Sequence, residues 1–178
     1  HARSFIALGD FNQAETALRA CLWLEPRLLD AHNHLARFVW MRTGDGVQAT
    51  ATMDQALQTF ANENALWAAK AAILQGAGDA RSAYACLAVQ ASRPGAPPAL
   101  LVRAGLAALE FDPVAALGLA ERALRAMPTD IGARKLLIAA QLGIGDAASA
   151  LPHCDVLLAL TPDDQYLIAL QTTAWRLL

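Results

Sequence analysis

A ladder of glycine–aspartate pairs runs through this chain of 178 residues. The pairs are Gly9-Asp10, Gly44-Asp45, Gly78-Asp79 and Gly145-Asp146, and the last interval is about twice as long as the first two. The long interval contains Phe111-Asp112, which keeps the aspartate and divides the interval into two nearly equal halves. The resulting period of about 34 residues is typical of helix pairs that stack on one another, and not of an enzyme built around one central core. The spacing therefore predicts an all-α solenoid of tandem antiparallel helix pairs.

Two further series keep the same period. An alanine lies five residues after the start of each turn, at Ala14, Ala49, Ala83, Ala116 and Ala150. Prolines close three of the units, at Pro26, Pro128 and Pro162. The turn glycine can adopt the left-handed conformation that ends a helix, the aspartate can cap the next helix, and the small alanine lets paired helices approach closely.

These landmarks predict one domain over residues 1–178, divided into repeating units. The predicted units are 1–28, 29–63, 64–96, 97–130 and 131–164, followed by a partial unit, 165–178. The segment from Ser92 to Pro98 is rich in proline and glycine, so it cannot be helical throughout.

Composition supports helices and narrows the partners. Hydrophobic residues make up 56% of the chain but aromatic residues only 6%, so the apolar content is mainly alanine and leucine, which favour helices. A net charge of -2 argues against nucleic acid or a membrane as the main partner. The three cysteines, Cys21, Cys86 and Cys154, are odd in number and widely spaced. They are predicted to be buried small apolar residues of a cytoplasmic protein.

The first unit reads FIALGDFNQAETALRACLWLEP, from Phe5 to Pro26, and the chain resembles the tetratricopeptide repeat (TPR) family over essentially its whole length. The second and fourth units depart from the family pattern. His32 stands at the early aromatic position, Ala61 stands where proline is expected, and Phe111 replaces glycine. The resemblance implies a right-handed superhelix of about five repeats, partial at both ends. It also implies that the first helix of each pair lines a concave surface that binds a protein or peptide.

The ends of the chain do not coincide with unit boundaries. The chain starts partway through a first helix and stops at Leu178, one residue before the next turn glycine is due. We therefore expect a fragment of a longer, bacterial protein, with a homodimer through the exposed terminal helices as the alternative. The ending TPDDQYLIALQTTAWRLL is similar to the junction at which such repeats precede a 2-oxoglutarate/Fe(II) oxygenase domain. This resemblance implies an accessory arm that positions substrate, with the catalytic domain beyond Leu178.

The segment His153-Cys154-Asp155 contains the H-x-D pattern of such oxygenases. That chemistry needs a second histidine farther along the chain, and no histidine follows His153. The register also places this segment inside a helix, where residues two apart point to different faces. The same offset separates His32 from His34, which makes them a poor metal site. We therefore predict that this segment is not an enzyme and has no catalytic residue, metal site or cofactor.

The register of the repeats also predicts a binding surface. The inward-facing candidates are Arg3, Asn33, Arg37, Trp40, Gln75, Leu101, Lys135, Tyr166 and Arg176. Asn33, Arg37 and Trp40 share one helix face and could bind a peptide backbone, a carboxylate and an apolar side chain. The alternative is a solvated polar face with a half-buried tryptophan.

The third unit limits the kind of ligand. It has Ala65, Ala68 and Ala72 where chaperone-tail-binding members of the family carry a carboxylate clamp. An alanine-lined groove favours apolar or helical contacts, including contacts with another segment of the same parent protein.

Overall fold

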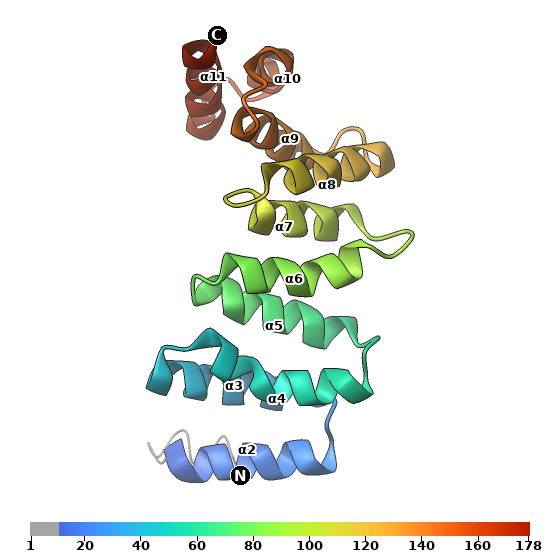
Figure 1. The fold of residues 1–178 in the computed structure, drawn as a ribbon, viewed down its shortest axis with the longest axis vertical. Coiled ribbons are helices and arrows are strands. Elements are labelled where there is room, and N and C mark those ends of the chain that lie inside the picture. Colours follow the sequence, from blue (N-terminus) through green and yellow to red (C-terminus); the bar gives the residue numbers. More distant parts are fainter. Residues whose placement is uncertain (1–10) are drawn as a thin grey trace. The chain divides into compact units, whose positions relative to one another are not determined.

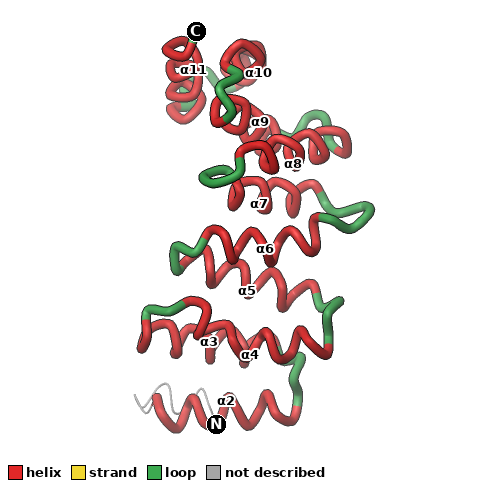
Figure 2. Tube along the Cα trace, in the orientation of Figure 1, coloured by secondary structure: helices red, strands yellow, loops and turns green. Residues whose placement is uncertain are grey.

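The computed structural model describes residues 11–178 of the chain as α-helices joined by turns (Figure 1). The helices are α2 (Phe11–Leu24), α3 (Leu29–Thr43), α4 (Gly46–Thr59), α5 (Asn64–Gly76), α6 (Ala80–Ala91), α7 (Pro98–Ala108), α8 (Pro113–Ala126), α9 (Ile131–Gly143), α10 (Ala147–Leu160) and α11 (Gln165–Leu177). Figure 2 shows only helices and loops in this described range. The predicted all-α class is confirmed.

The helix starts repeat with the period of the sequence landmarks. Helices α2, α4, α6, α8 and α10 begin at Phe11, Gly46, Ala80, Pro113 and Ala147. Helices α3, α5, α7, α9 and α11 begin at Leu29, Asn64, Pro98, Ile131 and Gln165. The intervals between successive starts are the same in the two series, and each is about 34 residues. The chain is therefore built from helix pairs that follow the predicted period.

The chain divides into two compact units, His1–Cys86 and Leu87–Leu178, and the division falls inside α6. From here on, the first unit and the second unit are these two parts, and the units of about 34 residues are called repeats. In the first unit α3 packs against α2, α4 and α5, and α4 also packs against α5. In the second unit each helix from α7 to α11 packs against the next, and α9 also contacts α7 and α11. Within each unit, the first helices of consecutive pairs therefore lie side by side.

The turn glycines behave as predicted where the structure describes them. Gly44, Gly78 and Gly145 have φ angles of 68°, 81° and 84°, which is the left-handed conformation that ends a helix. Gly9 lies outside the described residues. Phe111 does not adopt a positive φ. In that turn the Asp112 amide donates to the Ala108 carbonyl at 2.8 Å, so the helix ends without a left-handed residue.

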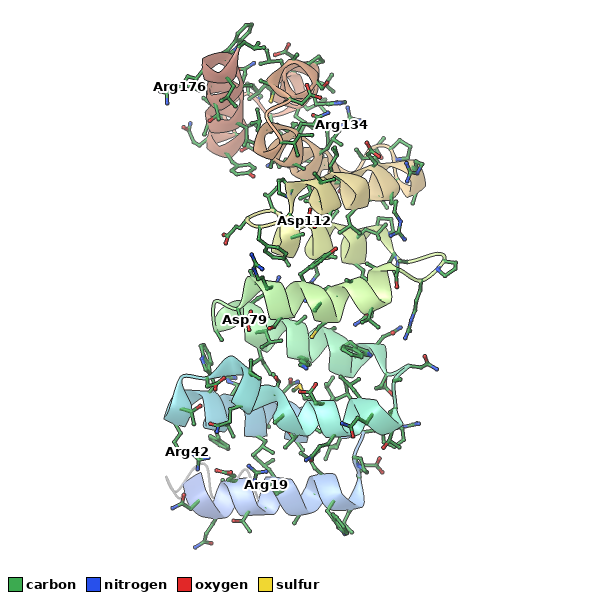
Figure 3. All side chains as sticks on the ribbon, viewed as in Figure 1. Arg19, Arg42, Asp79, Asp112, Arg134 and Arg176 are labelled. Carbon is green, nitrogen blue, oxygen red and sulfur yellow. The ribbon has the colours of Figure 1, made fainter. Side chains whose placement is uncertain are left out.

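The turn aspartates cap the helices that follow them. Asp45, Asp79, Asp112 and Asp146 each accept a backbone N–H from two or three residues onward, and Figure 3 labels Asp79 and Asp112. These caps confirm the prediction, and Asp10 lies outside the described residues. Two more aspartates, Asp130 and Asp164, cap α9 and α11 in the same way. The sequence reasoning did not identify these two caps.

The core of each unit lies between its helices. The recurrent alanines are all buried, as expected for small residues between packed helices: Ala14, Ala49, Ala83, Ala116 and Ala150. In the first unit Leu35, Val39 and Met53 pack together around the small residues. Cys86 and Cys154 are buried as predicted, but the prediction was wrong for Cys21, which no described helix covers.

Candidate binding surface

In the first unit, four of the sequence candidates lie on α3 and α5. Asn33 and Arg37 lie one turn apart on α3; Asn33 is half-buried and Arg37 is exposed. Arg37 has no hydrogen bond or ion pair with any other residue in the described range. Among the residues that the structure describes, its guanidinium is therefore available to a partner.

Trp40 connects α3 to α5. It is half-buried and packs against the core of the first unit. Its ring lies over Gly76, where an added Cβ atom would be 3.9 Å from the Cη2 atom of Trp40. Gln75, exposed at the end of α5, is the neighbour of Gly76 in the chain. The structure therefore brings Trp40 next to the α5 segment that carries Gln75.

Met41 extends this surface and was missed by the sequence reasoning. It is 71% exposed and borders a cavity of about 260 Å³ that Asn12, Glu15, Phe38 and Arg42 also line. Glu15 accepts from Arg19 at 2.8 Å and from Arg42 at 3.0 Å, and Figure 3 labels both arginines. The ion pairs of Glu15 therefore border an apolar patch that contains Phe38 and Met41. The signal that could have found Met41 is its position beside Trp40, outside the buried positions of α3.

In the second unit, Lys135 and Tyr166 lie together but serve the packing of α9 against α11. The Nζ atom of Lys135 is 2.5 Å from Oδ2 of Asp164 and 5.9 Å from the centroid of the Tyr166 ring. The charge of Lys135 is therefore already paired with the Asp164 carboxylate within the chain. Tyr166 and Arg176 are exposed, whereas Arg3 lies outside the described residues.

Leu101 needs a correction, because it is only 2% exposed and cannot meet a partner. It occupies the helix position that His32, Trp67 and Arg134 occupy in other repeats. Those three side chains turn back toward the preceding turn rather than toward the inward-facing surface.

The Lys135 hydrogen bond and the bonds from the Tyr166 and Leu167 amides hold the pKa of Asp164 below its usual value, with the lysine as the largest cause. A carboxylate whose pKa is lowered by folding stabilises the protein above its unfolded pKa of about 4 and loses that effect as the pH falls through the folded pKa. We expect Asp164→Asn to unfold at lower urea concentration than the wild type at pH 7. Asparagine can still cap α11, so the difference should vanish at pH values below the folded pKa.

Urea unfolding followed by circular dichroism from neutral to strongly acidic pH measures this effect. Asp163→Asn is the matched control, since Asp163 makes no cap among the described contacts and is exposed. A difference between Asp164→Asn and wild type that persists unchanged at acidic pH would assign the loss to cap geometry instead of charge.

The His153-Cys154-Asp155 segment has structural contacts. Asp155 accepts a hydrogen bond from Nε2 of Gln171 at 2.8 Å, which ties α10 to α11. Burial lowers the pKa of His153 and raises that of the buried Cys154. Within residues 11–178, no three histidine, cysteine, aspartate or glutamate side chains cluster as metal ligands would. In the same range, no helix is both long enough and apolar enough to cross a membrane.

Comparison with known proteins identifies the fold. No family model and no curated protein matches the chain. A crystal structure of a tetratricopeptide repeat protein from Parabacteroides merdae is similar with a TM-score of 0.72 and 17% identity, over 99% of this chain and 70% of that one. The crystal structure of MamA protein is similar with a TM-score of 0.63 and 16% identity, over 89% of this chain and 86% of that one.

A thermophilic TPR protein from Thermus thermophilus has a TM-score of 0.53 and 20% identity, over 98% of this chain and 95% of its own. These similarities confirm the predicted TPR-like fold. They lend no support to an oxygenase parent.

Proposed function

We propose that this chain is a non-catalytic scaffold that binds a protein or peptide across the first helices of its pairs. The observation that carries the proposal is the surface formed by Arg37, Trp40 and Met41 on α3 with Gln75 on α5. Arg37 is an exposed cation without a partner in the described range, next to an apolar patch. Arginine, tryptophan and methionine are enriched in protein-binding surfaces relative to the rest of the protein surface.

The chemistry of this surface indicates the kind of ligand. An unpaired guanidinium can bind a carboxylate with two hydrogen bonds. Trp40 and Met41 offer apolar area that can adapt to a side chain. Ala68 and Ala72 on α5 are small, so a peptide helix can approach the surface closely. The surface therefore suits a peptide that places an acidic residue beside an apolar one.

Selection from a phage-displayed random peptide library on the purified chain tests the proposal. We expect selected peptides to contain an acidic residue next to an aromatic or aliphatic one. The double variant Arg37→Ala plus Trp40→Ala should weaken binding of a synthetic selected peptide by about 100-fold, because interface arginines and tryptophans often dominate affinity. Isothermal titration calorimetry measures that change, and circular dichroism should show unchanged helical content.

Arg125→Ala is the matched control. Arg125 is also exposed, but it lies on α8 and has only a long ion pair of 3.9 Å with Glu121. This variant should bind the peptide as the wild type does. Equal affinity of the double variant and the control would remove this surface from the site. Exposed Trp175 and Leu177 on α11 make self-association an alternative use of apolar surface, so light scattering accompanies each titration.

A further inference from the structure

One hydrogen bond recurs near the start of the first helix in three repeats. The Nε2 atom of His32 lies 2.8 Å from the Pro26 carbonyl oxygen. Trp67 Nε1 donates to the Ala61 carbonyl at 2.9 Å, and Arg134 Nη2 donates to the Pro128 carbonyl at 2.9 Å. Each bond spans six residues and ties a first helix to the turn before it. Where this position carries a donor, the bond therefore fixes the start of the first helix against the turn before it.

His32 makes this bond with a ring smaller than the indole of Trp67, and a pocket lies beside the His32 ring. The pocket has a volume of about 420 Å³, within the range of small-molecule sites. It opens between α2 and α4, with Leu22, Trp23 and Phe60 among its apolar walls. The Arg27 guanidinium stacks over the Phe60 ring at 4.2 Å from its centroid and so supports that wall. The pocket lies on the α2 and α4 side of α3, away from Arg37.

Two residues that line the pocket each have a buried polar atom without a partner among the described residues. His32 is 1% exposed, and its Nδ1 atom has no partner. Because Nε2 must carry the proton to bond the Pro26 carbonyl, Nδ1 of the neutral ring is an acceptor. Burial lowers the pKa of His32, which favours the neutral ring. The second atom is the hydroxyl oxygen of Thr52 on α4, which can donate or accept.

Buried polar groups in native proteins are almost always paired, so these two atoms indicate that something completes the pocket. We propose that the pocket binds a neutral small molecule that carries an amide group on an aromatic ring. The amide N–H donates to Nδ1 of His32, and the amide carbonyl accepts from the Thr52 hydroxyl. The aromatic ring lies against Trp23 and Phe60. A carboxylate has no donor for Nδ1, and a hydrocarbon satisfies neither atom.

Benzamide is the probe for this proposal, with benzoate and toluene as comparison compounds. We expect benzamide to bind with a Kd of about 1 mM, as a fragment of this size allows. In nitrogen-15 NMR spectra it should shift the indole signal of Trp23 and the Nδ1 signal of His32. Benzoate and toluene should bind at least about threefold more weakly, since each loses one or both hydrogen bonds.

Thr52→Val and Thr50→Val form a matched pair on α4. Thr50 is also buried, but its hydroxyl already bonds the Gly46 and Val47 carbonyls and it does not line the pocket. Thr52→Val should weaken benzamide about three- to tenfold while leaving the free protein as stable as the wild type or more so. Thr50→Val should destabilise the free protein and leave the benzamide Kd unchanged.

Three results would overturn the proposal. The first is toluene binding as tightly as benzamide, which would make the pocket a purely apolar cavity. The second is an unchanged benzamide Kd in Thr52→Val. The third is the absence of any benzamide-induced shift at Trp23 and His32. None of these results bears on the peptide surface, because Arg37 and Trp40 do not line the pocket.

Discussion

Replacing Gly105 with leucine is expected to lower the free energy of unfolding by about 3 kcal/mol, the upper part of the usual range for overpacking a core. Gly105 lies in α7 where this helix packs against α9. A Cβ atom added there would lie 2.3 Å from Cδ2 of Leu136 and 3.3 Å from its Cγ atom. Leu136 is only 1% exposed, so its side chain has little room to move aside. Urea unfolding followed by circular dichroism measures the loss.

Gly118→Ala is the control, because Gly118 also lies within a helix but has no atom within 4 Å of an added Cβ. Removing a helical glycine at an open position should raise stability by about 0.5–1 kcal/mol. The two substitutions should therefore change stability in opposite directions. If Gly105→Leu were as stable as the wild type, α7 and α9 would not approach as closely as the structure shows.

The second large effect is expected for Leu35→Ala. Leu35 is fully buried in the core of the first unit, together with Leu18, Val39 and Met53. Deleting a fully buried leucine side chain and leaving a cavity costs about 2–5 kcal/mol. Urea unfolding gives the total loss. Hydrogen exchange of backbone amides should show reduced protection in α3 and α4, which enclose the cavity.

Leu24→Ala is the matched control for this substitution. Leu24 is 82% exposed at the end of α2, so its truncation should change stability by less than about 0.5 kcal/mol. A loss below that level for Leu35→Ala would contradict the position of Leu35 in the core.

The features that could be predicted from sequence depend on residues close together in the chain. A left-handed glycine such as Gly44 and a capping aspartate such as Asp45 act within three residues of one another. The burial of Ala49 follows from its fixed distance to that turn. These local signals recur from repeat to repeat, so each repeat supports the assignment of the others. They were sufficient to predict the fold class.

The features that could not be predicted depend on residues far apart in the chain. Lys135 was nominated for a partner, but Asp164, 29 residues later, already binds it. Leu101 was placed on the surface because the register alone does not show which side chains turn inward. Trp40 was proposed as a candidate from its place in the register, but its contact with Gly76 depends on the packing of α3 against α5. His32 was recognised as a departure from the family pattern, whereas the pocket beside it depends on α2 and α4.

The aspartate caps have a consequence for how such a chain can change its length. Asp79, Asp112 and Asp146 each bind an amide three residues onward, so the signal that starts a helix is carried by the same short segment as the helix. An in-frame duplication or deletion of one period would therefore bring or remove a helix pair together with its own start signal. The remaining helices would keep their caps. Growth or loss by whole repeats therefore needs no compensating substitution at the helix starts.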